Sequence, residues 1–328
     1  MSAVARWVAA KIGAAILVVW IVATLVFFAL RLSGDPLEAI LGGPGSQAGE
    51  ETVQAAIEAY ALDRPLAWQY LLQLKDIATL QLGDSFARRQ PVADLLAAQL
   101  PRTLALAAIS LAVAWIIAVT GSIIQAASRG RAGIVVGVVM RGLEIVASVM
   151  PQFWLGAVLI MIFSSGLGWL PATSAGSGAT ALVMPVITLA IPIAGFLSQV
   201  SRDALDEADA APFAVTARAR GAGEIRVLLR HTLRHASLPA IALSGWAFGN
   251  LLSGAVVVEV LFARPGLGRL LQEAALSRDV PVVIGAVVVV ALMYVIVVTL
   301  TDVIELAADP RLRRRTRRVG PPEIVVGS

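Results

Sequence analysis

The sequence predicts an all-α polytopic membrane protein with six transmembrane helices and an extracytoplasmic helical cap between the first two. Of its 328 residues, 58% are apolar and only 15% are charged, whereas soluble domains carry about 25% charged residues. Long charge-free stretches recur along the chain, and a helix needs about 20 apolar residues to cross the hydrocarbon core. The chain has no cysteine, which excludes disulfide frameworks, thiol nucleophiles and Cys-based zinc sites.

Five charge-free stretches supply the six predicted spans. The first is longer than a signal-peptide core and is followed directly by Arg31 without an Ala-x-Ala site, so we expect an uncleaved helix. The third stretch is 57 residues long and contains Ser-Gly turn signals at 164–168 and 176–178, so it predicts two helices joined by a short outside loop. The stretches cover residues 12–30, 103–128, 145–201, 236–258 and 280–301.

Basic residues predict the orientation, since cytoplasmic loops carry an excess of Lys and Arg. Segment 202–235 holds six arginines and the tail 311–328 holds six more. With six spans, both termini are then expected in the cytoplasm. The chain divides into a cytoplasmic stub with the first span (1–30), an outer loop (31–102), a core of five spans (103–310) and the basic tail.

The sequence of the outer loop predicts a small helical cap outside the membrane, and it contains no catalytic constellation. A Gly-Gly-Pro-Gly connector at 42–45 comes first, and Pro65 and Pro91 stand where helices would begin. Apolar residues then recur at helical spacing. They are Val53, Ile57, Tyr60, Trp68, Leu71, Leu72, Ile77, Val92, Leu95 and Leu96.

Segment 202–235 predicts a helix, a glycine turn and a second helix along the membrane face. Good helix formers occupy 213–220, Gly-Ala-Gly at 221–223 interrupts them, and the helical pattern resumes at Glu224. An ordinary amphipathic interfacial helix would carry the same charges. The apolar stripe of the second helix consists of Val227, Leu228, Leu229 and Leu233, opposite Arg226, Arg230 and Arg234.

This segment also carries a family resemblance. Thr-Ala-Arg-Ala-Arg-Gly at 216–221, Val-Leu-Leu-Arg-His at 227–231 and Leu-Pro at 238–239 resemble the cytoplasmic coupling loop of ATP-binding cassette importer permeases of the oligopeptide/dipeptide/nickel subfamily. Val-Thr-Ala at 215–217 departs from the Glu-Ala-Ala that usually begins this motif. Further motifs of the subfamily follow in order between residue 5 and about residue 312. They lie at 62–66, 69–71, 153–156, 167–171, 257–259, 265–271 and 309–311.

The resemblance implies a permease subunit in the bacterial cell (inner) membrane that passes oligopeptides or dipeptides by alternating access. Nickel or another small solute is the alternative cargo. Implied partners are a second permease subunit forming a heterodimer, two ATPase subunits or domains, an extracytoplasmic substrate-binding protein and membrane lipid, but no nucleic acid. The chain's two lysines, Lys11 and Lys75, stand outside any Gly-Lys-Ser/Thr motif. We therefore expect no enzyme activity or bound cofactor here, with ATP and Mg²⁺ on the ATPase partners.

Three sets of candidate site residues follow, with no catalytic or metal site. Glu259, at the outside end of the fifth span, is expected either to contact the binding protein or to anchor its loop. Polar or polarisable residues in the spans are candidates for the translocation path: Met150, Gln152, Trp154, Gln199 and Asn250. The coupling-loop candidates are Thr216, Ala217, Arg218, Arg220, Gly221, Glu224, Arg226, Arg230 and His231.

Other charged residues leave alternatives open. Arg141 and Glu144 are three apart near the start of the third span. They either serve a pathway, or they satisfy each other or snorkel at the helix end. His231 and His235 are four apart, but the arginines beside them would repel a cation, so no metal is expected. Three prolines within predicted spans should kink or loosen them: Pro151, Pro185 and Pro192.

Two other function classes remain as alternatives. A self-sufficient secondary transporter often has inverted repeats and intramembrane carboxylates, and this sequence has neither a convincing repeat nor a carboxylate in the middle of a span. An intramembrane enzyme would need a nucleophile or a metal motif, but His-Glu-x-x-His, cysteine and a Ser–His pair within the spans are all missing.

Overall fold

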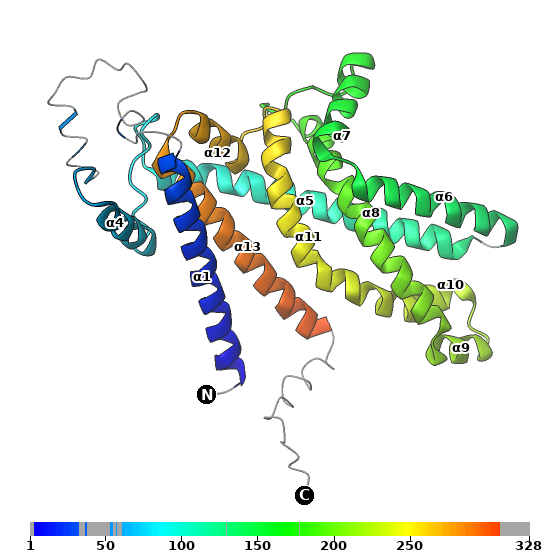
Figure 1. The fold of residues 1–328 in the computed structure, drawn as a ribbon. Helices are drawn as coiled ribbons and strands as arrows, with labels where there is room; N and C mark the ends of the chain where they lie inside the picture. The colour runs from blue at the N-terminus through cyan, green and yellow to red at the C-terminus, as the bar shows by residue number, and fades with distance from the viewer. Residues whose placement is uncertain are drawn as a thin grey trace, which may run out of the picture.

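The computed structural model describes residues 3–32, 37, 53–54, 57, 61–128, 130–176 and 178–308. Within these residues the regular elements are helices, apart from one isolated β-bridge between Asp84 and Pro91 (Figure 1). The elements are α1 (Ala3–Leu32), α4 (Leu66–Ala78), α5 (Val92–Ala127), α6 (Gly130–Val149), α7 (Gln152–Leu159), the π-helical turn η1 (Ile160–Gly166), α8 (Thr180–Ala210), α9 (Pro212–Ala219), α10 (Glu224–Val227), the π-helical turn η2 (Leu228–Thr232), α11 (Leu233–Leu261), α12 (Leu267–Leu276) and α13 (Val280–Ala308).

Five of these helices are long and apolar enough to cross a membrane. A sixth crossing results if α6 and the α7–η1 pair count as one broken span. The predicted all-α polytopic fold is confirmed in this form. The unbroken candidate spans are Arg6–Ala29, Val92–Gln125, Thr180–Ala210, Pro239–Leu261 and Val280–Ile304.

The third span begins earlier than predicted and is broken. Helix α6 starts at Gly130, and its axis meets that of α7–η1 at an angle of 106°. Pro151 stands at the break in an extended conformation with φ −63° and ψ 128°, and proline lacks the N–H that would continue the α6 hydrogen-bond ladder. The turn predicted at 164–168 is confirmed only at its end: residues 164–166 belong to η1, and Gly168 beyond it has a positive φ of 66°.

Helix α5 starts inside the predicted outer loop. Val92, Leu95 and Leu96 belong to its first turns and are buried against α12 and α13. Pro101 lies inside this helix without ending it. A proline in a helix interior costs about 3 kcal/mol, whereas burial of each Val or Leu side chain contributes about 1.5–3 kcal/mol. Burial therefore outweighs the proline, and the helix continues to Val92.

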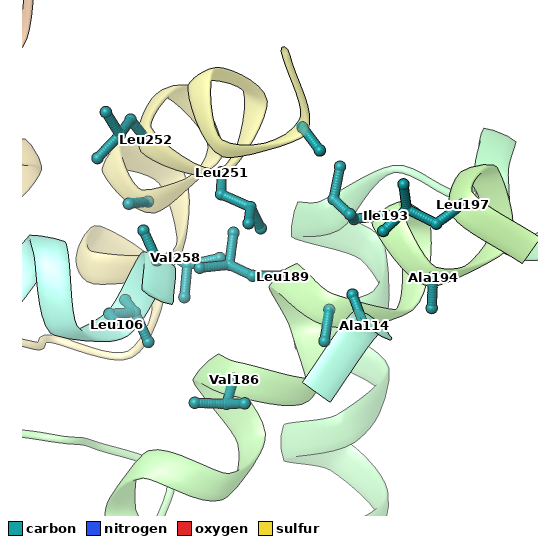
Figure 2. Close-up of a cluster of buried hydrophobic side chains, with 14 of the residues drawn as sticks. Leu106, Ala114, Val186, Leu189, Ile193, Ala194, Leu197, Leu251, Leu252 and Val258 are labelled. Carbon is teal, nitrogen blue, oxygen red and sulfur yellow. The ribbon is translucent and has the colours of Figure 1, made fainter. Parts of the chain in front are cut away.

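Helix α8 is the centre of the bundle and packs against α5, α6 and α11. Its Leu189, Ile193 and Leu197 are buried together with Leu106 of α5 and Leu251 of α11 (Figure 2). The helix is continuous through Pro185 and Pro192, both of which were expected to loosen it.

Helices α1 and α13 form the side of the bundle farthest from α6 (Figure 1). Lys11 of α1 forms an ion pair with Asp302 of α13. Helix α4 lies beside α1, where the hydroxyl groups of Thr24 and Tyr70 are 2.7 Å apart. The start of α1, the end of α13 and the α9–α10 region all lie at one end of the bundle, and α12 lies at the opposite end (Figure 1).

Candidate functional site

The segment between α8 and α11 forms a short helical hairpin. Pro212 begins α9 at the first helical position, where its missing N–H costs nothing. The chain reverses at Gly221, whose φ is 83°, and the N–H of Gly221 donates to the Arg218 carbonyl over 2.9 Å. Helix α10 then leads through η2 into α11. The predicted helix, glycine turn and second helix are confirmed.

The hairpin packs its apolar side onto the ends of the two long helices that it joins. Val227 is fully buried, and Leu228 packs with Leu205 of α8 and Ala236 of α11. Arg226 is exposed, as is Arg230. The predicted separation of apolar and basic faces is confirmed for these residues, whereas the side chains of Leu229 and Arg234 lie outside the described residues.

The candidate coupling residues differ in what they contact. Arg218 forms an ion pair with Asp209 at the end of α8 and also donates to its carbonyl over 3.1 Å, so it holds the hairpin against α8. The Thr216 hydroxyl donates to the Pro212 carbonyl within α9 over 2.7 Å. Arg220 is exposed and Ala217 is half-buried. The side chains of Glu224, His231 and His235 lie outside the described residues.

A buried carboxylate joins α5, α6 and α8 near the end of α8 that leads into the hairpin. Glu144 of α6 forms an ion pair with Arg202 of α8. The side-chain amide of Gln125 on α5 donates to the same carboxylate over 2.9 Å. Because breaking a buried ion pair costs several kcal/mol, this cluster fixes the spacing of the three helices.

Of the alternatives considered for Arg141 and Glu144, mutual pairing is wrong. Each finds its partner on α8, and the guanidinium of Arg141 lies 4.0 Å from the carboxylate of Asp206. The path candidate Gln199 also belongs to this contact, because its amide donates to the Glu144 carbonyl over 3.2 Å and to the Ser148 hydroxyl over 3.0 Å. The side-chain amide of Gln199 therefore joins α8 to α6.

At the opposite end of the bundle, Glu259 is fully buried and ties α11 to α5 and α12. The Thr103 hydroxyl of α5 donates to Oε1 over 2.6 Å. The backbone N–H groups of Gly268 and Arg269 donate to Oε2 over 2.7 and 3.3 Å. Thr103 also accepts the N–H of Leu267 over 2.8 Å. The carboxylate thus satisfies donors at the N-terminus of α12, where negative charge is favoured.

The connection from α11 to α12 requires glycine at two positions, because other groups lie too close for a side chain there. A Cβ on Gly268 would lie 2.3 Å from Cα of Val256, and one on Gly266 would lie 2.1 Å from Oε1 of Glu259. Burial lowers the pKa of the Arg264 guanidinium in this loop, and the charge of Glu259 opposes that shift. With both oxygens bonded internally, Glu259 serves as the anchor of its loop, one of the two roles considered for it.

A second carboxylate at this end, Asp279, was missed by the sequence analysis. It is buried between α12 and α13 and accepts hydrogen bonds from the Ser85 hydroxyl over 2.5 Å and from the N–H groups of Phe86 and Ala87 over 3.1 and 3.2 Å. An Asp directly before a predicted helix is a recognisable capping signal. Its partners lie more than 190 residues away in the sequence, so spacing alone gives no indication of them.

Replacing Asp279 with alanine is expected to release the turn at residues 84–91. Three donors lose their acceptor, and the buried one, the Ser85 hydroxyl, costs about 1–3 kcal/mol when it is left unsatisfied. Because Arg88 and Arg89 of this turn are exposed, we expect faster trypsin cleavage there in the detergent-solubilised protein. Asp84→Ala is the matched control, since the Asp84 side chain is exposed. Equal cleavage rates in the two variants would contradict the anchoring role.

The remaining path candidates lie along α7 and α11. Asn250 is exposed on α11, and Trp154 of α7 is half exposed. Gln152, at the start of α7, lies directly against α11, because a Cβ on Gly254 would be 2.1 Å from its Oε1. Met150 is half-buried at the break between α6 and α7. Gln152 therefore lies against α11, the helix that carries Asn250, whereas Gln199 contacts α6.

The chain is similar to known proteins over most of its length. A family model described as "binding-protein-dependent transport system inner membrane component" matches residues 118–314. A Brucella abortus (strain 2308) protein, provisionally named a peptide transport system permease protein, is 33% identical over 311 residues, covering 92% of this chain and 97% of the relative. The glutathione transport system permease protein GsiC of Escherichia coli (strain K12) is 33% identical over 297 residues, covering 90% and 94%. The crystal structure of an amino acid ABC transporter with histidines aligns with a TM-score of 0.44 and 16% identity, covering 69% of this chain and 95% of that chain.

Proposed function

The chain belongs to the family of binding-protein-dependent transport system inner membrane components, and we propose that it forms part of a path that carries peptides into the cell. As a family member it is a multi-pass inner membrane permease subunit of an ATP-binding cassette importer, and it works with ATPase and binding-protein partners. The proposal adds the substrate class, the coupling segment, the composition of the complex and the orientation.

Oligopeptides or dipeptides are the proposed substrates. Support comes from relatives that cover nearly the whole chain, one named for a peptide transport system and one for glutathione, which is itself a tripeptide. Nickel or another small solute is the alternative. ATP and Mg²⁺ would be bound by the two ATPase subunits or domains, and a second permease subunit would complete the path.

The α9–α10 hairpin is the observation that carries the mechanism. It presents Arg220, Arg226 and Arg230 to the outside while its two arms continue into α8 and α11, the helices at the centre of the bundle. A displacement of an ATPase docked on this hairpin would therefore move α8 and α11 directly. Docking there would put the hairpin in the cytoplasm, and both ends of the described chain lie at the same end of the bundle (Figure 1).

Purification of the tagged chain from its native membrane in mild detergent tests the assembly. We expect two ATPases with P-loop motifs and a second six-span permease to copurify. The reconstituted complex, supplied with the binding protein, should then take up a labelled tripeptide when ATP is present. Recovery of the chain alone in several detergents would argue against the importer complex, and ATP-driven uptake of nickel but of no peptide would refute the substrate class.

Replacing Gly221 with valine is expected to weaken coupling. A residue with a side chain costs roughly 1–2 kcal/mol in the left-handed region, and Gly221 has a φ of 83°. No atom lies within 4 Å of the added Cβ, so the change strains the turn without a clash in the bundle. We expect normal amounts of the chain in the membrane, less ATPase recovered with it, and slower ATP-dependent uptake.

Gly223→Val provides the matched control. Gly223 lies two residues further along the same turn, has no positive φ, and also has no atom within 4 Å of an added Cβ. The control should retain ATPase recovery and uptake close to those of the unchanged protein. If Gly221→Val behaves like Gly223→Val, the turn geometry has no part in coupling.

A further inference from the structure

One face of α11 is exposed, although the helix lies between α13 and α8 (Figure 1). Its other faces pack against α5, α7, α8, α12 and α13, and Leu251, Leu252 and Val258 point into the core (Figure 2). The exposed residues are spaced by four, three and four positions, so they form one stripe along the helix. The α11 stripe consists of Trp246, Asn250, Ser253 and Val257.

The α11 stripe differs in chemistry from a surface that faces lipid. On α1 the exposed residues between Ile12 and Leu25 are all apolar. Asn250, in contrast, lies near the middle of the span Pro239–Leu261, and its amide has no hydrogen-bonding partner among the described residues. Burying an amide in hydrocarbon without a partner costs about 2–7 kcal/mol. The stripe is therefore better suited to water or to a polar ligand than to lipid tails.

Two side chains from other helices lie close to the stripe. Toward the hairpin, the ring of Trp246 lies 4.6 Å, between centroids, from the ring of Phe196 on α8. Toward α12, the amide of Gln152 lies against Gly254, which follows Ser253 in the sequence but is buried on an adjacent face of α11. The polar residues Asn250 and Ser253 thus come directly after an aromatic pair, and a second amide lies on the neighbouring, covered face of the helix.

We propose that the α11 stripe lines the water-filled translocation path and that Asn250 hydrogen-bonds the main-chain amides of a passing peptide. The assignment rests on the proposed function, because it takes peptides as the substrate. A side-chain amide offers both donors and an acceptor, which match the N–H and C=O groups common to all peptides. Recognition of the main chain would leave the identity of the peptide's side chains open, and Trp246 with Phe196 would offer them an apolar surface.

The absence of cysteine from the chain makes single-cysteine labelling a direct test. The variants are Asn250→Cys and Ser253→Cys, with Leu17→Cys on the exposed apolar face of α1 and Ala247→Cys on the buried face of α11 as controls. Each is assembled into the complete importer and treated with a charged, membrane-impermeant methanethiosulfonate. Because a thiol ionises in water but not in apolar surroundings, we expect the two stripe variants to react at least about tenfold faster than both controls.

Two labelling results would overturn the assignment. Reaction of Asn250→Cys as slow as that of Leu17→Cys would mean that the stripe faces lipid. Efficient disulfide cross-linking of Asn250→Cys to the second permease subunit, without labelling in any nucleotide state, would mean that the stripe is a subunit interface. Neither result depends on which solute the importer carries.

Transport by substituted complexes tests the hydrogen-bonding role separately. We expect Asn250→Leu to slow ATP-dependent tripeptide uptake several-fold with unchanged ATPase recovery, and Asn250→Gln to restore much of the rate. Full uptake by Asn250→Leu would overturn the role of the amide. If the unchanged complex carries no peptide at all, the proposed function fails, whereas the labelling result still decides whether the stripe lines a path.

Discussion

Replacing Glu259 with alanine will lower the free energy of unfolding by at least about 3 kcal/mol, because three donors lose their acceptor at about 1–3 kcal/mol each. These donors are the hydroxyl of Thr103 and the backbone N–H groups of Gly268 and Arg269. They belong to α5 and to the first turn of α12, so the loss separates the elements that Glu259 joins. The effect is measured as a lower thermal unfolding temperature of the purified complex and as less chain in the membrane.

Two further variants distinguish the anchoring role of Glu259 from a general effect of removing a negative charge. Glu259→Gln keeps one acceptor oxygen in the same place and should fall between alanine and the unchanged protein. Glu273→Ala removes a partly exposed carboxylate from α12 that pairs with Arg88, and surface pairs contribute only about 0–1 kcal/mol. An unfolding temperature for Glu259→Ala as high as that for Glu273→Ala would rule out the anchor.

Glu259 and Asp279 together hold the elements at the α12 end of the bundle in place. The first carboxylate ties α11 to α5 and α12, and the second ties the turn at 84–91 to the junction of α12 and α13. At the hairpin end, by contrast, Arg220, Arg226 and Arg230 are exposed, and the apolar side together with the Arg218–Asp209 ion pair holds the hairpin in place. Under the proposed function, the exposed hairpin would move with the ATPase while the α12 end of the bundle stays rigid.

The spans could be predicted because a charge-free run of sufficient length has few alternatives to a membrane helix. Their ends could not, since they depend on contacts with other parts of the chain. Val92 starts α5 because α12 and α13 bury it. Helix α6 includes Arg141 and Glu144 because α8 supplies a partner for each. The sequence shows Pro151, but it does not show how far the chain turns there.

The candidate site likewise contains features that could be predicted from the sequence and features that could not. The hairpin depends on local signals, namely Gly221 and the separation of apolar and basic residues, and these were read correctly. The pairs Glu144–Arg202 and Ser85–Asp279 join residues 58 and 194 positions apart, so no periodicity or motif indicates them. Glu259 was identified as a site residue from its position, but only its complete burial favours the anchoring role.

Replacing Gly195 with valine is expected to push α6 away from α8 and to lower the free energy of unfolding by about 3 kcal/mol or more, since overpacking costs about 1–3 kcal/mol and loss of a buried ion pair adds to it. A Cβ on Gly195 would lie 2.7 Å from the Glu144 carbonyl oxygen and 2.8 Å from the backbone nitrogen of Ser148. Both are main-chain atoms, so no side-chain rotation relieves the contact. The shift would also separate Glu144 from Arg202.

Gly142→Val is the matched control, because Gly142 lies on α6, within the same region, and no atom lies within 4 Å of an added Cβ. We expect its thermal unfolding temperature in the purified complex to remain near that of the unchanged protein, while that of Gly195→Val falls clearly. Since α8 leads into the hairpin, displaced packing should also reduce ATP-dependent uptake more than ATPase recovery. Equal unfolding temperatures for the two variants would show that α6 and α8 tolerate a wider spacing, and that the Glu144 cluster does not set it.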